Sequence, residues 1–166
     1  MHRVLFVCSG NTCRSPMAVG IFNKLVGAKK VRNLTAESAG TMAASGMKAS
    51  QLAVSVARRH GISLHRHRSR PITKELAERA ALILTMTGHQ WYDVTEFVPR
   101  GRASLLTRFG RPDGEGDDIP DPAGGDEEEY ERVFDQLEQM ITRSFCAVLE
   151  WMQTEAAPKA HGGRAR

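Results

Sequence analysis

Residues 8–15 read CSGNTCRS and follow the apolar run RVLFV at 3–7, so Cys8 and Arg14 flank a loop of five small or polar residues. A cysteine in an electropositive site forms a thiolate nucleophile. The planar guanidinium of an arginine binds two oxygens of a phosphate. A phosphorus held above Cys8 by Arg14 is placed for in-line attack, with donors ready for the charge on its oxygens. The pattern favours phosphoryl-group chemistry.

The same residues also have a structural interpretation, because a cysteine at a strand end is often a small buried hydrophobic residue. An arginine near the start of a helix is often only exposed. The strand before the loop, the helix after it and Ser15 directly after Arg14 favour the chemical interpretation. Gly10 permits close approach of the main chain, as a phosphate cradle requires. The loop matches neither GxxxxGK[ST] nor GxGxxG, which excludes the common nucleotide-binding loops.

The surrounding pattern predicts an α/β fold, because short apolar runs alternate with amphipathic segments. We expect a three-layer α/β/α sandwich with a four-stranded parallel sheet and the loop between the first strand and the first helix. Ligands bind at the carboxyl ends of such strands, where Cys8 lies. Pro16 fits the first helical turn, and we expect Ser15 to cap that helix. The predicted strands are 3–7, 34–40, 80–87 and 103–106, and the predicted helices are 16–26, 48–61, a short one after Thr73, 88–97 and 126–152.

The chain has 166 residues, a length that suits one domain, and its formal net charge is +4. We expect that domain to span 1–155, followed by a disordered tail at 156–166. A basic run at 58–70 has no interleaved aromatic residues, so we expect a solvated face and no nucleic-acid partner. No apolar stretch approaches the ~20 residues of a membrane helix. No signal peptide is evident, so we expect a cytoplasmic protein. The three cysteines lack the paired spacing of a zinc site, and we expect no metal.

The segment VLFVCSGNTCRSPMA at 4–18 strongly resembles the opening of the low-molecular-weight protein phosphatases. Further segments agree in order: SAG at 38–40, ILTMT at 83–87 and IPDP at 119–122. The resemblance covers about residues 3–152. It implies that Cys8 is the nucleophile, that Arg14 clamps the phosphate and that Asp121 is the general acid, with no cofactor. From the residues alone, any of four aspartates in the 108–125 loop could be the acid, and the Asp-Pro pair of the family selects Asp121.

The resemblance also implies which residues support the loop. Asn11 would brace it, Ser15 would donate a hydrogen bond to the thiolate, and Ser38 and His67 would support it from behind. His67 lies in HRSR, where the family often has His-Lys-Ala-Arg. The remaining loop residues of the predicted phosphate site are Ser9, Gly10, Thr12 and Cys13.

Two positions bear on which phosphorylated side chain the site accepts. Thr12 stands where tyrosine-directed members usually carry Ile or Leu and where members acting on phosphoarginine carry Thr. Its hydroxyl can orient a polar guanidinium, although a threonine there is also simply a tolerated β-branched residue. Ala123 is a departure, because both kinds of member commonly have an aromatic residue directly after Asp-Pro. Its side chain leaves a rim on which a phenyl ring stacks poorly, and Trp91 and Tyr92 are alternative sources of an aromatic rim.

We therefore expect a protein-arginine phosphatase acting through a phosphocysteine, with a protein-tyrosine phosphatase as the alternative. A thiol-coupled arsenate reductase of the same family needs further cysteines, and only Cys146 remains, which we expect in the core of the last helix. A phosphate-binding module without catalysis would need neither Cys8 nor Asp121. We expect a monomer with a phosphorylated protein as its partner. We also expect Cys8 to have a lowered pKa and, on oxidation, to form a disulfide with Cys13.

Overall fold

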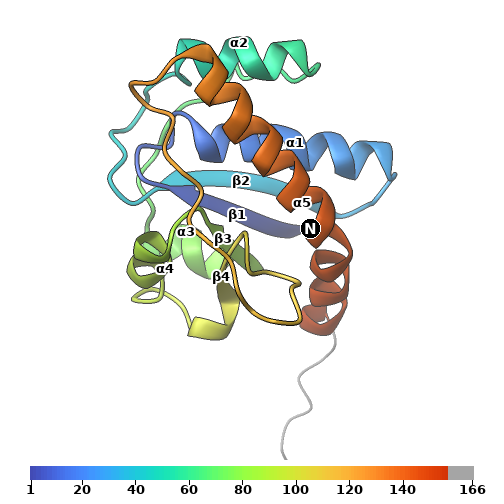
Figure 1. The fold of residues 1–166 in the computed structure, drawn as a ribbon. Helices are drawn as coiled ribbons and strands as arrows, with labels where there is room; N and C mark the ends of the chain where they lie inside the picture. The colour runs from blue at the N-terminus through green and yellow to red at the C-terminus, as the bar shows by residue number, and fades with distance from the viewer. Residues whose placement is uncertain (157–166) are drawn as a thin grey trace, which may run out of the picture.

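The computed structural model describes residues 1–156 of the chain (Figure 1). A four-stranded sheet forms its centre, with helices on both faces, so the predicted three-layer α/β/α architecture is confirmed. Its elements in chain order are β1 (His2–Cys8), α1 (Arg14–Ala28), β2 (Leu34–Gly40), α2 (Gln51–Arg59), α3 (Lys74–Arg79), β3 (Leu82–Thr85), α4 (Gly88–Val94), the 3₁₀ turn η1 (Arg100–Arg102), β4 (Ala103–Leu105) and α5 (Glu127–Ala156).

The sheet is parallel throughout and has the strand order β2-β1-β3-β4; its four parallel strands are those that the sequence predicts. Its register sets Cys8 opposite Gly40 of β2 and Val7 opposite Thr85 of β3. The carboxyl ends of the strands therefore meet at one edge. Because β1 lies between two neighbours, the loop that follows Cys8 starts at the middle of that edge.

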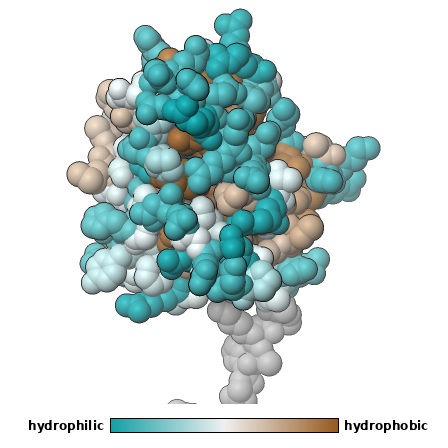
Figure 2. All heavy atoms as spheres, viewed as in Figure 1, coloured by the Kyte–Doolittle hydropathy of each residue, from teal (hydrophilic) through white to brown (hydrophobic). Residues whose placement is uncertain are grey.

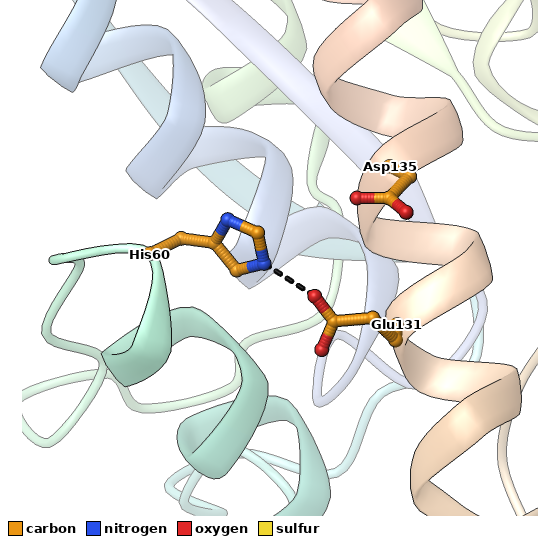
Figure 3. Close-up of side chains that lie close together, drawn as sticks. All are labelled: His60, Glu131 and Asp135. Atoms are coloured by element: carbon orange, nitrogen blue, oxygen red, sulfur yellow. Dashed lines mark hydrogen bonds and ion pairs between the residues drawn. The ribbon is translucent and has the colours of Figure 1, made fainter.

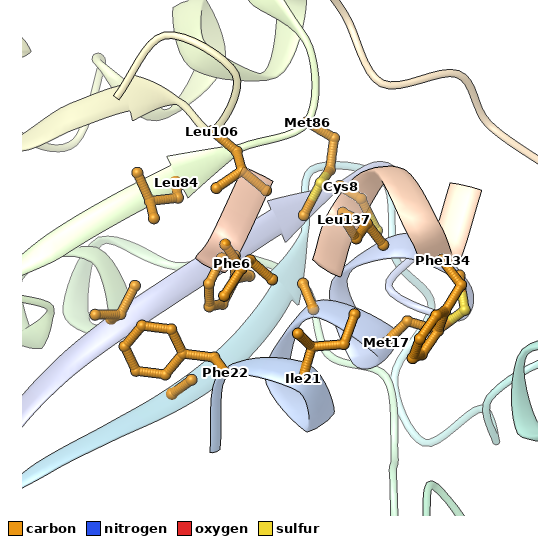
Figure 4. Packing of buried hydrophobic residues seen from close by; sticks show 14 of the residues in the cluster. Phe6, Cys8, Met17, Ile21, Phe22, Leu84, Met86, Leu106, Phe134 and Leu137 are labelled. Atoms are coloured by element: carbon orange, nitrogen blue, oxygen red, sulfur yellow. The ribbon is translucent and has the colours of Figure 1, made fainter. Parts of the chain in front are cut away.

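Alternation along β1 explains the two helical layers. Val4, Phe6 and Cys8 belong to the larger apolar cluster, which α1, α2 and α5 cover (Figure 4). Leu5 and Val7 face the other way, into a smaller cluster with residues of α3 and α4. In Figure 1, α1, α2 and α5 lie on one side of the sheet, and α3 and α4 lie on the other. Every residue from Val4 to Cys8 is buried, which suits a central strand between two layers.

The first helix begins earlier than the sequence predicts, and the assignment of Ser15 as its cap is wrong. Helix α1 starts at Arg14, so Ser15 is inside the first turn, and its N-cap residue Cys13 makes no side-chain cap hydrogen bond. The Ser15 hydroxyl instead contacts Cys8 Sγ and Asn11 Nδ2. The tight loop after β1 winds directly into the helix, so the local capping pattern gives way to contacts within the loop.

The last helix also corrects a prediction. Its buried face carries Ile141, Phe145, Val148 and Met152, at helical spacing. Cys146 is exposed, because one position beyond Phe145 the helix turns its side chain by about 100° away from that face. The expected core position of Cys146 is therefore wrong. Helix α5 extends to Ala156, and the tail predicted at 156–166 otherwise lies outside the described residues.

The surface of the described part is largely polar. Figure 2 shows hydrophilic residues over most of one face, with hydrophobic residues in small separate areas. The large hydrophobic side chains that are exposed are Met1, Met42, Met47 and Tyr92. Among residues 1–156, no helix combines the length and the apolar character that crossing a membrane requires.

Candidate active site

The loop between β1 and α1 packs closely against the end of β2. Gly40 ends β2 beside Cys8, and a Cβ atom added to Gly40 would clash with the Ser9 carbonyl oxygen and lie 3.0 Å from Asn11 N. The Thr41 and Met42 amides then donate to the carbonyls of Cys8 and Ser9. Only a glycine permits this approach, which explains the glycine of SAG in physical terms. The main chain of the loop is thereby fixed from the β2 side.

Asn11 is the central brace of this loop. Its side chain is fully buried and its φ is +55°, a conformation that costs free energy unless the surroundings hold it. Asn11 Nδ2 donates to Ser15 Oγ at 2.8 Å and to Ser38 Oγ at 2.9 Å, and Asn11 Oδ1 accepts from the Arg70 amide at 2.9 Å. The Asn11 carbonyl accepts from His67 Nε2 at 2.6 Å. The structure thus brings Ser15, Ser38 and His67 together around one residue.

Cys8 lies beneath this network with 2% of its surface exposed. Its Sγ is 2.9 Å from Ser15 Oγ and 3.3 Å from Asn11 N, which donates to it. Because Asn11 Nδ2 already donates to the Ser15 oxygen, the hydroxyl proton of Ser15 is left for the Cys8 sulfur. Burial raises the pKa of the Cys8 thiol, while donation from Ser15, the charge of Arg14 and the Asn11 amide oppose that rise. The expected lowering is therefore not met, because the strand end lies under two helices and burial outweighs the donors.

Arg14 is buried, with 3% of its surface exposed, and its guanidinium makes two contacts. Nη1 donates to the Ile119 carbonyl at 2.9 Å, and Nη2 pairs with Asp121 Oδ2 at 3.0 Å. The buried Nε–H has no hydrogen-bond partner among the described residues. A buried donor without an acceptor costs about 1–3 kcal/mol. An anion bound beside Cys8 would satisfy it, and the Nε–Nη2 edge is the one that binds two phosphate oxygens.

Asp121 reaches Arg14 from the long loop before α5. Its side chain is 46% exposed and is held by the ion pair with Arg14 and by Ala123 N, which donates to Oδ1 at 3.1 Å. Pro122, next to it, is buried and anchors the loop. Asp118 Oδ1 accepts from Gly88 N at 2.8 Å and so fixes the start of α4. Among the loop aspartates whose side-chain contacts are described, Asp121 alone pairs with Arg14.

A buried cysteine, a buried arginine with an unsatisfied donor and a half-exposed carboxylate now stand at one sheet edge. A model of the family described as low molecular weight phosphotyrosine protein phosphatase matches residues 3–154. This chain belongs to that family. It is an enzyme family, so the chain is a cysteine-dependent protein phosphatase of the low-molecular-weight type, and the family resemblance seen in the sequence is confirmed.

Relatives and solved structures agree with this assignment. A protein-arginine-phosphatase of Geobacillus stearothermophilus is 37% identical over 154 residues, which cover 93% of this chain and 98% of the relative. The low molecular weight protein-tyrosine-phosphatase Wzb of Escherichia coli is 36% identical over 138 residues, covering 83% and 89%. The structure of the YwlE arginine phosphatase from Geobacillus stearothermophilus superimposes with a TM-score of 0.81 at 36% identity, covering 95% of this chain and 99% of that one.

The structure places the two predicted specificity residues apart, Thr12 within the loop and Ala123 in the segment that carries Asp121. Thr12 is half-buried, and its carbonyl accepts from the Ser50 amide at 2.9 Å. Thr12 Oγ1 lies 3.6 Å from Cys13 Sγ and would be 3.5 Å from a Cβ atom on Gly10, so it sits beside the middle of the loop. Ala123 is exposed beside Asp121. Trp91, considered as an aromatic rim, donates its indole N–H to the Ala103 carbonyl and packs between α4 and β4.

Two residues that the sequence analysis missed touch the loop. Tyr130 of α5 is buried, and its hydroxyl lies 3.2 Å from Cys13 Sγ and 3.2 Å from Ser50 Oγ. Burial raises the pKa of Tyr130 to about 12, so the phenol stays protonated at neutral pH. Gln90 of α4 donates from Nε2 to Ser9 Oγ at 3.0 Å. Tyr130 and Gln90 each lie in the first turn of a helix that begins near the carboxyl edge of the sheet. That position in the predicted helices is the only sign of either residue that the sequence offers.

Within residues 1–156, one group of three side chains has ligand types that suit a metal: His60, Glu131 and Asp135 (Figure 3). Figure 3 shows His60 pointing to Glu131 across the gap between α2 and α5. The His60 ring stacks on Phe134, with centroids 4.1 Å apart. Arg59 also pairs with Glu131, and this cation opposes the binding of a second one. The cluster is an ion-pair network that joins α2 to α5.

Proposed function

We propose that this phosphatase hydrolyses phosphoarginine in proteins through a phosphocysteine formed on Cys8. The buried Nε–H of Arg14, without an acceptor among the described residues and beside a nucleophile, carries the proposal of phosphoryl transfer. The arginine preference is supported by the Thr12 hydroxyl and by the two relatives named protein-arginine-phosphatase, which are 37% and 36% identical. The proposed catalytic residues are Cys8, Arg14 and Asp121.

The contacts suggest how the three groups share the reaction. The phosphoryl group binds the loop amides and the Nε–Nη2 edge of Arg14, where its oxygens replace the Asp121 carboxylate as the partner of Nη2. Released from that ion pair, Asp121 takes up the proton that Cys8 loses as it becomes a thiolate, and donates this proton to the leaving nitrogen. Cys8 Sγ bonds to phosphorus as the P–N bond breaks, and the unmodified arginine side chain leaves. Water then attacks the phosphocysteine, Asp121 accepts its proton, and the S–P bond breaks to yield inorganic phosphate and Cys8.

The supporting residues act on the nucleophile and on the loop. Donation from Ser15 and from the Asn11 amide favours the thiolate over the thiol and so assists attack. The four hydrogen bonds of Asn11 hold the main chain of the loop in place before the substrate arrives. Donors that are fixed in advance stabilise the transition state without reorganisation.

Arginine preference has a physical basis in the polar wall of the loop. Phosphoarginine presents N–H groups beside phosphorus, where phosphotyrosine presents an apolar ring. A hydroxyl at Thr12 can hydrogen-bond to those groups, and a site with buried polar groups rejects a substrate that leaves them unpaired. Ala123 offers no aromatic wall for a phenyl ring. Because arginine-directed members commonly have an aromatic residue there too, the preference for the guanidinium rests on Thr12.

Phosphotyrosine is the second candidate substrate. Solved relatives include a low molecular weight protein tyrosine phosphatase from T. tengcongensis, with a TM-score of 0.82 and 34% identity. The two substrates are distinguished by kcat/KM on peptides of one sequence that carry phosphoarginine or phosphotyrosine at the same position. We expect the phosphoarginine peptide to be favoured at least ~10-fold. Equal values, or a preference for phosphotyrosine, would contradict the proposed specificity.

Arsenate reduction is disfavoured by the position of the third cysteine. Cys146 lies about four and a half helical turns beyond Tyr130 on α5, which corresponds to about 24 Å along the axis. Tyr130 is the α5 residue that contacts the loop at Cys13. A disulfide relay from Cys8 through Cys146 is therefore out of reach. We further propose that the enzyme acts as a cytoplasmic monomer on phosphorylated proteins, with its catalytic domain in residues 1–155.

A further inference from the structure

Gln90 occupies a buried position between β3, α4 and the phosphate loop, with 2% of its surface exposed. Its Oε1 accepts from the backbone amides of Met86 and Thr87, each at 3.1 Å. Two backbone donors fix which end of the amide faces the strand, so the Nε2 end must face the loop. There it donates to Ser9 Oγ at 3.0 Å. The orientation of Gln90 is thus set by the main chain at the carboxyl end of β3.

This contact determines how the Ser9 hydroxyl can act. Since Gln90 donates to Ser9 Oγ, one lone pair of that oxygen is occupied and its own proton points elsewhere. Among the described residues, no acceptor for that proton contacts Ser9. Ser9 directly follows Cys8 and is only half-buried. A hydroxyl proton without an acceptor in the described part of the chain therefore belongs to the residue that directly follows the nucleophile.

The same arrangement occurs on the other side of the loop. Asn11 Oδ1 accepts a backbone amide, Asn11 Nδ2 donates to Ser15 Oγ, and the Ser15 proton is left for Cys8 Sγ. In both cases a buried side-chain amide, oriented by main-chain donors, orients a serine hydroxyl. The Asn11–Ser15 pair directs its proton at the sulfur. The Gln90–Ser9 pair leaves its proton without an acceptor in the described part of the chain.

We propose that Gln90 is a positioning residue that orients the Ser9 hydroxyl to donate to an oxygen of the transferring phosphoryl group. The proposal rests on the phosphoryl-transfer function above and adds a donor to it. A hydrogen bond that strengthens as charge develops on that oxygen stabilises the transition state. Gln90 itself touches neither phosphorus nor sulfur and acts through Ser9.

The hydrogen bond to Ser9, and not the helix cap, requires glutamine rather than glutamate at this position. Gln90 and Thr87 form a capping box at the start of α4, in which Thr87 Oγ1 accepts from Gln90 N and Gln90 Oε1 accepts from Thr87 N. A glutamate fills this capping role equally well. A carboxylate at this position, however, has no proton to donate, so the Ser9 hydroxyl would turn round and donate to it. The Gln90→Glu variant thus keeps the cap while reversing the hydroxyl.

The first experiment measures phosphate binding without turnover. In a Cys8→Ser background, the dissociation constant of inorganic phosphate is measured by titration calorimetry with and without Gln90→Glu. We expect Gln90→Glu to weaken phosphate binding about tenfold, because the Ser9 hydroxyl then donates to the carboxylate and not to the phosphate. Thr73→Ala, which removes a cap from α3, serves as a control that lowers stability and leaves phosphate affinity unchanged. Unchanged affinity in Gln90→Glu would overturn the proposal.

A double-mutant cycle tests whether Gln90 acts through the Ser9 hydroxyl. It distinguishes this role from a general structural role of Gln90 and from the effect of the charge that glutamate introduces. Gln90→Met adds no charge, and we expect it to weaken phosphate binding when Ser9 is present and to have no further effect in Ser9→Ala. Ser9→Thr, which keeps the hydroxyl, should restore the dependence on Gln90. Equal weakening by Gln90→Met with and without the Ser9 hydroxyl would show a merely structural role and overturn the proposal. Since phosphate binding is measured apart from hydrolysis, an inactive wild-type enzyme would contradict the proposed function and leave this result standing.

Discussion

Two segments meet at Arg14, residues 8–15 and residues 108–126, and they are held in different ways. In the first, Asn11 alone makes four hydrogen bonds through its side chain and its carbonyl, and Cys8, Arg14 and Ser15 are buried. In the second, Asp121 is nearly half-exposed and depends on one ion pair and one amide. The comparison separates a fixed anion site from a carboxylate that can move.

The different catalytic roles of the two segments, charge stabilisation and proton transfer, explain why they are held differently. Stabilising charge on a phosphoryl group requires donors that do not rearrange, and burial with full hydrogen bonding keeps them in place. A proton donor must instead leave Arg14 when the phosphate binds and then reach the leaving group. The exposure of the Asp121 side chain permits that movement, while buried Ile119 and Pro122 hold the main chain on either side of it. Rigid and mobile parts therefore meet at one arginine.

The largest expected effect comes from the fixed segment. Cys8→Ser should lower turnover about 10⁴-fold or more, because the nucleophile is lost, while phosphate still binds to the loop. Steady-state kinetics on a phosphoarginine peptide and calorimetric titration of phosphate measure the two quantities. Cys146→Ser is the matched control and should retain wild-type turnover, since Cys146 is exposed on α5. Substantial turnover by Cys8→Ser would contradict the mechanism.

The mobile segment should give the second largest effect. Asp121→Asn keeps the shape of the side chain but removes proton transfer, so kcat on the phosphoarginine peptide should fall by ~10²-fold. The loss should be smaller on para-nitrophenyl phosphate, whose leaving group needs less protonation. Asp117→Asn changes another carboxylate of the same loop and serves as the control. An equal loss on both substrates would argue against Asp121 as the acid.

Substitution of Thr12 tests whether its hydroxyl sets the preference for phosphoarginine. Thr12→Ile removes the hydroxyl and adds apolar surface, so the ratio of kcat/KM for phosphoarginine over phosphotyrosine should fall at least ~10-fold. Thr12→Ser, which keeps the hydroxyl, should retain the wild-type preference. The ratio is measured on matched peptides. If it is the same in all three proteins, Thr12 only packs within the loop and specificity has another origin.

The pH dependence of kcat/KM tests whether Ser15 stabilises the Cys8 thiolate. Burial raises the pKa of Cys8, and donation from Ser15 opposes that rise. Ser15→Ala should therefore raise that pKa further, and the acid limb of kcat/KM should move to higher pH. Alkylation of Cys8 by iodoacetamide should slow several-fold at neutral pH, because less thiolate is present. Ser55→Ala removes an exposed hydroxyl and is the control. A faster alkylation of Ser15→Ala would contradict this assignment.

The smallest effect concerns the stability of the fixed segment. Burial lowers the pKa of His67, so the unfolded chain binds its proton more readily than the folded chain. The stability that neutral His67 contributes is full above its ordinary pKa of about 6.5 and is lost as the pH falls through the folded pKa. His67→Gln should make urea stability less dependent on pH between about 7 and 5. An unchanged pH dependence in His67→Gln would contradict this assignment.

Local sequence patterns were enough to determine much of this protein. Short apolar runs that alternate with amphipathic segments predict the parallel sheet, and β2 at 34–40 is found with the predicted bounds. The chemical types and spacing of Cys8 and Arg14 point to phosphate, because the strand and the helix beside them are also local features. The family resemblance adds Asp121 through the Asp-Pro pair. The predicted Cys8–Cys13 disulfide stays a prediction, and Cys13 Sγ contacts Tyr130.

Only the tertiary structure decided which distant groups surround these residues and how deeply they are buried. The contact of Gln90 with Ser9 spans 81 positions and that of Tyr130 with Cys13 spans 117, so no local pattern encodes either one. The pKa of Cys8 depends on the helices that cover it, and burial reverses the expected direction. Hydrogen bonds and desolvation are set by neighbours in space, whereas sequence patterns report neighbours along the chain. The sequence therefore determines the reacting groups, and the folded chain determines their environment.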